Sequence, residues 1–445
     1  MGSPANGPAA DTGTAAQGHG TAAETRRPSA AVIGAGVSGL TAAYLLSRTH
    51  DVTLFEAEDR LGGHAHTHDV PGSDGGRHAV DSGFIVHNAV TYPWLRKLFG
   101  ELGVQVRPAE MSMSVRCEGC GLEYAGGRGL RGVFAQRRRL IDPRFLRMLW
   151  QVQRFHRRAL AFLRTTGEQN LATYGEFLER EGFSGYFIAH YAVPVVSCVW
   201  SAGRETALAY PARYLFRFLD QHGLLRAGGS PQWYTVAGGS RVYVERLAGR
   251  LKDVRAAHAV TDVTRGEGGV QIRDVTGRIT RVDRVVIATH ADQALGLLTD
   301  PSGAEVTTLK QFGYSANVTV LHTDSSVLPD AARARACWNY RMTSCHRPGQ
   351  PAVVSYWMNR LQGQRAAQDF LVTLNDRERL DPESIVATME YEHPIYTPEA
   401  VRAESQLGDL ATDRTVYAGA YHGWGFHEDG CRSGVEAARH FGVTW

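Results

Sequence analysis

A glycine-rich turn near the N-terminus has the residue types and spacing that bind a dinucleotide. Gly34-x-Gly36-x-x-Gly39, which encloses Ser38, follows a short apolar stretch and precedes a predicted helix from Leu40, so Gly34, Gly36, Ser38 and Gly39 are its candidate cofactor-binding residues. Glycines let the backbone turn tightly and approach a pyrophosphate, whose charge meets the N-terminus of the following helix. Glu56 ends the next apolar stretch, 22 residues after Gly34. Its carboxylate can accept hydrogen bonds from both ribose hydroxyls, so the pattern predicts a dinucleotide site.

The residues that follow this acid narrow the choice of cofactor. Glu56-Ala-Glu-Asp-Arg60-Leu-Gly62-Gly63-His64 resembles the ExxxRxGG signature of the flavin amine oxidase and phytoene desaturase superfamily. The resemblance implies that Arg60 and the paired glycines run beside the pyrophosphate and ribityl chain of FAD. It also places His64 next to the cofactor. Nicotinamide dehydrogenases have no such extension, so we expect FAD.

Three further segments resemble other parts of the FAD site in that superfamily. Residues 80–84 are similar to the segment beside the flavin ring, and residues 260–263 to the strand whose backbone contacts adenine. Residues 417–430 are similar to the second FAD motif, which implies that a backbone N–H meets the pyrimidine edge of the flavin. Beyond the glycine turn, these likenesses imply the cofactor-binding residues Ser82, Gly83, Phe84, Val260, Gly419, His427, Asp429 and Gly430.

A more specific likeness concerns the reaction. The phrases DSGFIVHN, CGLEYAG and GFHEDG resemble a bacterial NAD/FAD-binding protein group of FAD-dependent oxidoreductases, over residues 29–445. Its members are often encoded beside lipid methyltransferases of the cyclopropane-fatty-acid synthase type. The resemblance therefore implies two-electron dehydrogenation of a hydrophobic substrate, such as a fatty-acyl chain, by hydride transfer to flavin N5. Three alternatives stay open: a flavin amine oxidase, a flavin-dependent double-bond isomerase, and an accessory flavoprotein of a lipid methyltransferase.

Candidate catalytic residues each have a purely structural alternative. Lys310 is a candidate because many amine oxidases of the superfamily hold a Lys–water pair near N5, although exposed lysines are the common case. Phe426 is similar in place to one wall of an aromatic cage, and Trp424 is a candidate for the other wall; core packing is the alternative. His87 follows the flavin-side segment and could be a general base. Weaker candidates for the cage and for the base are Trp338, Trp357, Tyr421 and His290.

Histidines and cysteines raise the question of a metal. His64, His66 and His68 alternate, which in an extended segment puts three imidazoles on one face, for a metal or a proton relay. Cys117-Glu-Gly-Cys120 is the one close cysteine pair, and it lacks the second pair that such zinc sites carry. We therefore predict no metal site, and the role of the cysteine pair stays open.

The elements that must position these residues predict an α/β fold. An apolar strand, the glycine turn, a helix over 40–47 and a strand over 51–55 form a βαβ unit, which implies a parallel sheet. We predict a Rossmann-like FAD-binding domain of the amine oxidase type with an interleaved α+β substrate domain. The FAD-binding domain comprises residues 29–100, 235–300 and 410–445, the substrate domain residues 101–234 and 301–409, and residues 1–28 a disordered tail.

Further extended segments and helices are expected in the substrate domain. The strands are predicted over 317–322, 352–358, 370–374 and 385–391. Apolar residues at helical spacing predict a largely helical stretch over 128–162, with further helices over 174–181 and 211–218.

The composition limits which classes of partner the chain is expected to bind. The 445 residues carry a net charge of +3, which gives no support for nucleic-acid binding. Residues 128–158 hold ten Arg and one acid, a local charge of +9, interleaved with aromatic residues. This stretch is either a surface that docks on anionic lipid headgroups or an acyl carrier, or a solvated face. We expect a cytoplasmic protein, peripheral to the membrane if the first interpretation holds, with a small hydrophobic substrate and a lipid methyltransferase as a further possible partner.

Overall fold

The glycine turn lies at the carboxyl end of the central strand of a five-stranded parallel sheet. The computed structural model describes residues 1–445 except 3–6, 8–25, 227–229, 346–348 and 350. Consequently, most of the predicted disordered tail (1–28) lies outside the described residues. The predicted α/β fold with a Rossmann-like parallel sheet is confirmed. The strand order is β10 (Asp253–Arg255), β2 (Asp51–Phe55), β1 (Ser29–Ile33), β14 (Arg284–Ile287) and β20 (Thr415–Tyr417).

Two helices pack closely against each other beside this sheet. Helix α1 (Val37–Leu46) is buried throughout and begins three residues earlier than predicted, because it starts directly after the turn at Gly36. Helix α15 (His427–His440) crosses α1 at small residues. A Cβ atom on Gly434 would lie 2.3 Å from the backbone oxygen of Ser38. The same sheet region carries the helices α2 (Pro93–Leu102), α10 (Arg241–Ala248), α11 (Ala291–Leu297) and α12 (Gly303–Leu309).

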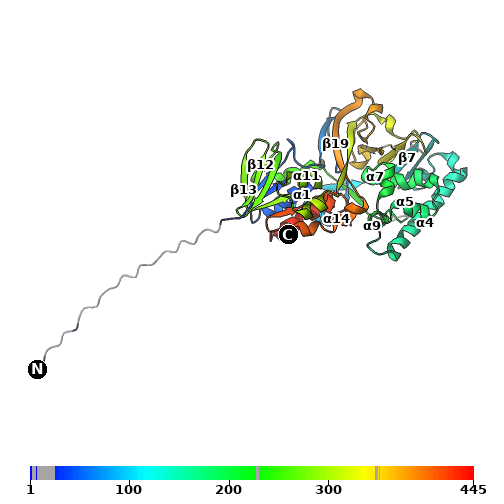
Figure 1. The fold of residues 1–445 in the computed structure, drawn as a ribbon. Coiled ribbons are helices and arrows are strands. Elements are labelled where there is room, and N and C mark those ends of the chain that lie inside the picture. The colour runs from blue at the N-terminus through cyan, green and yellow to red at the C-terminus, as the bar shows by residue number, and fades with distance from the viewer. Residues whose placement is uncertain (3–6, 8–25, 227–229, 346–348, 350) are drawn as a thin grey trace.

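Small antiparallel sheets flank the parallel one. At one end of the molecule lie β11 (Val260–Gly266), β12 (Gly269–Asp274) and β13 (Ile279–Val282), as Figure 1 shows. The sequence predicts strands at residues 260–263 and 270–272, which β11 and β12 confirm. It missed the hairpin of β3 (Thr67–Pro71) and β4 (Arg77–Asp81), and the three-stranded sheet of β5 (His87–Asn88), β9 (Trp233–Val236) and β6 (Val106–Ala109).

A seven-stranded sheet is the main sheet of the second half of the molecule. The four predicted strands are confirmed, as β15 (Gly313–His322), β17 (Val353–Trp357), β18 (Leu371–Leu374) and β19 (Ile385–Ile395). Three strands that the sequence did not predict complete it: β7 (Met113–Cys117), β8 (Leu122–Gly126) and β16 (Trp338–Met342). The order is β19-β15-β18-β17-β16-β7-β8, and β16 pairs with β7 in parallel.

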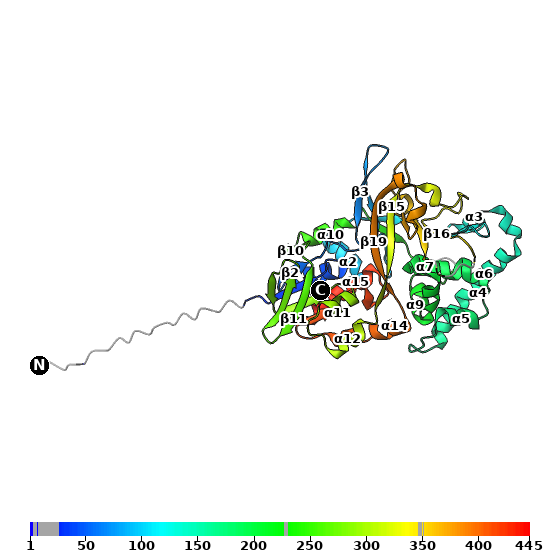
Figure 2. The same ribbon diagram turned by 45° about the horizontal axis from the view of Figure 1, so that its top comes forward.

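Helices between residues 129 and 221 lie at the end of the molecule opposite β12 and β13 (Figures 1 and 2). The predicted long helix is broken, because Asp142-Pro143 starts a new helix whose first amides the Asp142 side chain caps. The elements are α3 (Gly129–Val133), η1 (Arg137–Ile141), α4 (Pro143–Thr165), α5 (Tyr174–Arg180), α6 (Gly185–Phe187), η2 (Ile188–Ala192), α7 (Val193–Trp200), α8 (Arg204–Ala209) and α9 (Ala212–Gln221).

Short helices complete the chain, and buried aromatic rings fill the core beneath the helical end. The described residues contain no helix that is both long and apolar enough to cross a membrane. The short helices are η3 (Ser325–Val327), α13 (Met358–Leu361), η4 (Arg377–Arg379), η5 (Pro382–Ser384), α14 (Pro398–Glu404), η6 (Leu407–Leu410) and η7 (Ala420–His422).

Candidate active site

The three glycines of the turn meet different surroundings. Gly34 has φ +97°, and a Cβ there would lie 2.8 Å from the backbone oxygen of Ala288. A Cβ on Gly39 would lie 1.9 Å from the backbone oxygen of Gly34, so this position excludes any side chain. Gly36, by contrast, has no described atom within 4 Å of an added Cβ. The turn is therefore closed on the protein side and open at Gly36, where a ligand could approach the backbone.

The second glycine pair lies directly beside this opening. The amide of Gly62 donates a 2.9 Å hydrogen bond to the Ala35 carbonyl, and an added Cβ on Gly63 would lie 3.3 Å from the Cα of Gly36. The Arg60 guanidinium donates to the carbonyl of Gly63 at 2.7 Å. The two motifs that are read separately in the sequence thus form one continuous backbone cradle.

Glu56 is held at the rim of the cradle. Its carboxylate accepts hydrogen bonds from the Ala35 amide at 2.7 Å and from the Glu58 amide at 3.0 Å. The side chain is half-buried, and a carboxylate has further acceptor positions beside these two bonds. Its contact with ribose hydroxyls stays a prediction.

The flavin-side segment joins the cradle through the backbone of His64. The Phe84 amide donates to the His64 carbonyl at 2.7 Å, and a Cβ on Gly83 would lie 2.2 Å from that same oxygen. The Phe84 ring stacks on the His427 imidazole, with centroids 3.8 Å apart and planes at 10°. Residues 34–39, 62–64, 82–84 and 427 therefore form one site.

Asp81 fixes the segment that carries these residues. Its buried carboxylate accepts hydrogen bonds from Thr67 Oγ1 at 2.5 Å, from the Ser240 amide at 2.9 Å and from Gln362 Nε2 at 2.7 Å. Burial raises the pKa of Asp81 to about 6, against the lowering effect of these donors. Asp81 thus ties the end of β4 to α10 and to the residue that follows α13.

The site is lined from the substrate side by β19. Tyr391 and His393, two residues apart on that strand, bring their rings within 5.0 and 5.4 Å of the His64 ring. Sequence reasoning missed both residues, although their alternation at the end of a strand could have indicated a shared face. The buried Nε2 atom of His64 has no hydrogen-bond partner among the described residues.

The imidazoles and the phenol that line this site are held neutral. Burial lowers the pKa of His393 to about 4 and of His427 to about 3, and it lowers that of His64 well below its usual value. Burial also raises the pKa of Tyr391 to about 12. At neutral pH the lining carries uncharged imidazoles and a phenol.

The alternating histidines form a hydrogen-bonded chain. The Tyr391 hydroxyl lies 2.9 Å from His66 Nδ1 and 2.7 Å from Ser82 Oγ, which in turn lies 2.9 Å from His68 Nε2. The ring centroids of His66 and His68 lie 4.0 Å apart, and His64 and His66 both approach Tyr391 on β19. Strand β3 begins only at Thr67, and the shared face of all three imidazoles stays a prediction. Among the described residues, these histidines belong to no group of potential metal ligands.

Comparison with known families decides the class of the protein. Residues 37–440 match the family described as flavin containing amine oxidoreductase. The chain belongs to this family. It is an FAD-dependent oxidoreductase, and the predicted membership and cofactor are confirmed.

Solved structures share the fold over nearly the whole chain. A CLA-producing fatty acid isomerase from P. acnes has a TM-score of 0.67 at 18% identity, and covers 94% of this chain and 99% of its own. Cyclohexylamine oxidase from Brevibacterium oxydans has a TM-score of 0.68 at 16% identity, with the same coverage of both chains. At these identities the likeness extends to the fold alone.

One curated relative matches over a short stretch. Tryptophan 2-monooxygenase of Allorhizobium ampelinum is 60% identical over 47 residues, which are 10% of this chain and 6% of that protein. The chain therefore spans only a small part of this relative. The substrate of this amine oxidoreductase is not determined by the match.

The residues of the site fit the FAD of the amine oxidoreductase family. Gly36 is open to a ligand, the backbone of Gly63 lies beside it, and the buried Nε2 of the next residue, His64, has no described partner. Val260 begins β11, after a loop whose His258 amide donates to the Glu56 carbonyl at 2.9 Å. The strand predicted to contact adenine thus starts beside the acid predicted to bind the ribose, as a single extended cofactor would require.

The second FAD motif, residues 417–430, mainly fixes the position of helix α15. The Phe426 amide donates to the Asp429 carboxylate at 3.1 Å, so Asp429 caps the helix, and burial raises its pKa to about 6. An added Cβ on Gly430 would lie 2.6 Å from Val37 Cγ1, so the lack of a side chain here lets α1 pack closely against α15. The Gly419 amide donates to Ser433 Oγ at 2.9 Å. Gly430 and Asp429 hold the helix start in place, and direct cofactor contacts of either residue stay a prediction.

The aromatic residues proposed for a cage lie at the boundary with the helical end. Phe426 stacks on Phe218, with centroids 4.9 Å apart, and its half-buried ring lies 6.1 Å from that of Trp200. The Trp424 carbonyl accepts a hydrogen bond from Trp200 Nε1 at 3.0 Å, while its own buried Nε1 has no described partner. Tyr421 packs on Phe312 in a different core. Phe426 and Trp424 therefore line this boundary.

Two catalytic candidates, Lys310 and His87, lie in surroundings that favour their structural alternatives. Lys310 is exposed at the end of α12, and the structure does not bring it to the other candidates; a Lys–water pair has no support from this position. His87 is buried among rings that include Phe99 and Tyr234, and neither of its nitrogens has a described hydrogen-bond partner. Burial lowers the pKa of His87 to about 4, so it is a weak base.

Cysteine and histidine side chains gather at a second place, which sequence reasoning missed. Cys117 and Cys120 meet His190 and Cys345, and their ligand atoms all lie within 4.8 Å of one another. The partners come from positions 70 and 225 residues further along the chain than Cys120, so spacing along the sequence gave no signal. This group is called the Cys3His cluster below.

Proposed function

We propose that this amine oxidoreductase family member dehydrogenates a neutral, hydrophobic substrate, such as a fatty-acyl chain. The observation that carries the proposal is the charge state of the lining. The imidazoles of His64, His393 and His427 and the phenol of Tyr391 are all uncharged at neutral pH, because burial shifts their pKa values away from it. Uncharged side chains of this kind favour the binding of apolar groups.

The chain's own residues would hold the substrate against the cofactor and keep water out. FAD, when bound, accepts the two electrons as a hydride at N5. The Phe84–His427 stack and the β19 residues would fix the pose of the reacting carbon. The half-buried rings of Trp424 and Phe426 would bind the apolar chain beyond it. The chain of hydroxyl and imidazole groups from His66 to His68 offers a path for the proton that dehydrogenation releases.

Anaerobic reduction of the bound flavin tests the proposal. Purified holoenzyme is mixed with a panel of fatty-acyl compounds and a panel of primary and secondary amines, and flavin absorbance is recorded. The proposal expects bleaching by a fatty-acyl compound, with a product two mass units lighter. Phe426→Ala should raise the KM for that compound, while Phe312→Ala, in a different core, serves as the control for altered folding.

Three other outcomes would overturn the proposal in favour of the alternatives. Bleaching by amines alone, with hydrogen peroxide formed on reoxidation, identifies an amine oxidase. A product of unchanged mass identifies a double-bond isomerase. Inactivity alone but activity after addition of a lipid methyltransferase identifies an accessory flavoprotein.

An exposed surface of apolar and arginine side chains on the helical end supports the choice of a lipid substrate. Leu140, Ile141, Leu146 and Trp150 expose 52%, 85%, 41% and 58% of their surface. The exposed arginines beside them are Arg131, Arg137, Arg138, Arg144, Arg147, Arg157 and Arg158. Apolar side chains surrounded by arginine favour the interface of an anionic bilayer. We propose that this surface, the arginine face, docks on anionic lipid headgroups.

A further inference from the structure

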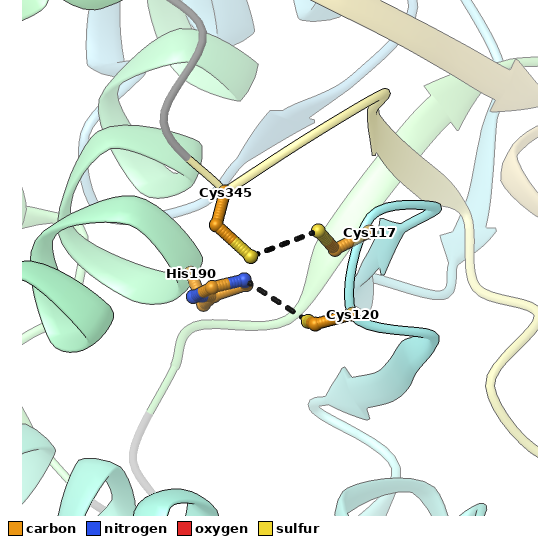
Figure 3. A group of neighbouring side chains, drawn as sticks. All are labelled: Cys117, Cys120, His190 and Cys345. Carbon is orange, nitrogen blue, oxygen red and sulfur yellow. Dashed lines mark hydrogen bonds between the residues drawn. The ribbon is translucent and has the colours of Figure 1, made fainter.

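Four potential ligands converge from three distant parts of the substrate half. Cys117 ends β7, Cys120 lies in the turn to β8, His190 lies on η2, and Cys345 follows β16. Figure 3 shows the three sulfur atoms and the imidazole pointing toward a common centre. Cys117 Sγ lies 3.6 Å from Cys345 Sγ, and Cys120 Sγ lies 3.5 Å from His190 Nε2.

These separations are those of a tetrahedral zinc site. With Zn–S bonds of about 2.3 Å and Zn–N bonds of about 2.1 Å, the edges of the tetrahedron are about 3.8 Å between sulfurs and about 3.6 Å between sulfur and nitrogen. We propose that Cys117, Cys120, His190 and Cys345 bind one structural zinc ion. Four protein ligands fill the coordination sphere, so the ion would have no open position for a substrate or water.

The surroundings of the cluster orient its ligands in the way metal sites require. His190 Nδ1 lies 2.9 Å from the Tyr186 carbonyl, which assigns the proton to Nδ1 and leaves the Nε2 lone pair for the metal. His190 is fully buried and lies on a π-helical turn, a rare conformation that is frequent at functional sites. An imidazole held in this way is already oriented with its Nε2 lone pair available to a metal ion.

The turn that carries the cysteine pair is fixed by a glycine conformation and by hydrogen bonds to its carbonyls. Gly121, directly after Cys120, has φ +62°, which a residue with a side chain rarely adopts. Its carbonyl accepts hydrogen bonds from Gln136 Nε2 at 3.0 Å and from the Arg138 guanidinium at 2.8 Å. The Arg139 guanidinium donates to the Cys120 carbonyl at 3.0 Å.

Charge also favours a metal here. Binding would release three thiol protons to solvent, and three thiolates with one Zn²⁺ leave a net charge of −1. The two neighbouring arginines, Arg138 and Arg139, would offset that charge. Part of the arginine-rich stretch would thus serve the zinc site rather than a lipid surface.

The zinc ion would link strands and helices that hydrogen bonds connect directly only in part. It would tie the β7–β8 turn and the end of β16 to the helical run that begins at Gly185 and ends at Trp200. Trp200 at the far end of that run donates to the Trp424 carbonyl and contacts Phe426. A zinc ion would therefore anchor the helix that supports the aromatic boundary of the active site.

Metal analysis of the full-length FAD-bound protein tests the proposal. Protein purified in reducing buffer with added zinc and then desalted should contain about one zinc ion per chain by elemental analysis. Cys120→Ser and Cys345→Ser should lose it, whereas Cys337→Ser, a buried cysteine in another core, should retain it. The ratio of FAD to protein reports whether each variant has folded.

A measurement on the unmodified chain keeps the proposal testable if the variants do not fold. Protein produced with Co²⁺ in place of zinc should show the intense visible bands of tetrahedral cobalt and the thiolate charge-transfer band. Absence of stoichiometric metal and of these bands, or a Cys117–Cys345 disulfide found by mass spectrometry in the same protein, would overturn it. Equal zinc loss from Cys337→Ser would overturn it as well.

Discussion

The glycines of the cradle differ in whether the folded protein itself leaves no room for a side chain. Gly34 and Gly39 are required by the protein itself, because a Cβ on either would collide with backbone oxygen atoms of Ala288 or Gly34. Gly36 has no such neighbour and has a φ of −69°, which any residue can adopt. The glycine at this position is therefore explained by the ligand and not by the fold.

Replacing Gly36 by Ala should separate cofactor binding from folding. The added methyl group meets no described protein atom, so the free energy of unfolding of the apoprotein should change by less than about 0.5 kcal/mol. The affinity for FAD should fall at least about tenfold, since the methyl group occupies the space of the ligand. Calorimetric titration of the apoprotein with FAD measures this, with Gly296→Ala on α11 as the control. An unchanged affinity would show that FAD does not approach this turn.

His87 makes stability depend on pH. Its folded-state pKa is lowered to about 4 from 6.5, so between these values the unfolded chain binds a proton that the folded chain does not. Stability is lost as the pH falls through this range. His87→Leu should remove the loss, so that the variant gains about 1–2 kcal/mol relative to the parent between pH 7 and pH 5. Urea unfolding with excess FAD at both values tests this, and the exposed His440→Leu is the control.

At the scale of elements, two helices and one strand bring the motifs together. α1 and α15 can cross closely because Gly430 and Gly434 leave room for Ser38 and its neighbours. This contact fixes where α15 begins, and with it the Phe84–His427 stack at the flavin side. β19 then closes the site from the other half through Tyr391 and His393.

The substitution Gly434→Ala should damage this helix crossing. A methyl group there would lie 2.3 Å from the Ser38 carbonyl oxygen and 3.0 Å from Thr41 Cβ, so the helices must separate. We expect the free energy of unfolding to fall by about 1–3 kcal/mol, with weaker FAD binding as a consequence. Urea titration measures the first effect, and Gly296→Ala in an open helix position is again the comparison. A change below about 0.5 kcal/mol would contradict this close crossing.

At the scale of the whole molecule, the parts of the chain alternate between the two halves. The parallel sheet takes strands from residues 29–55, 253–287 and 415–417, while the seven-stranded sheet takes strands from residues 113–126 and 313–395. The helices that carry the arginine face lie at the end opposite β12 and β13 (Figure 1). If that face docks on a membrane, the small sheet of β11, β12 and β13 points away from it.

Vesicle binding should depend on the arginine face and not on charge alone. A variant with Ile141→Ser, Arg144→Ser, Arg147→Ser and Trp150→Ser should bind anionic vesicles at least about tenfold more weakly, because each arginine contributes about 1 kcal/mol. The control variant Val275→Ser with Arg278→Ser alters an exposed apolar and basic pair on the hairpin of β12 and β13. Co-sedimentation with phosphatidylglycerol and phosphatidylcholine vesicles measures both. Equal binding by the two variants would exclude docking through this face.

The cofactor site was largely predictable because its signals are local. Gly34, Glu56 and Gly62 act through backbone turns and strand ends within a few residues, so their spacing alone predicts contact with a dinucleotide. The exposure of Lys310 favours the alternative of a solvated lysine, and it depends on how α12 packs, which no local pattern reports. Tyr391 and His393 were missed because their role arises only where β19 meets His64.

The sequence by itself indicated the family and the cofactor, through the resemblance of its short motifs to a known superfamily, and the parallel sheet, through short-range spacing that backbone geometry enforces. Only the tertiary structure decided which residues complete the site. It also decided that Cys117 and Cys120 have His190 and Cys345 as neighbours. The physical reason is the same in both cases. Contacts between residues far apart in the chain follow from packing of whole elements, and packing is a property of the folded core rather than of any segment.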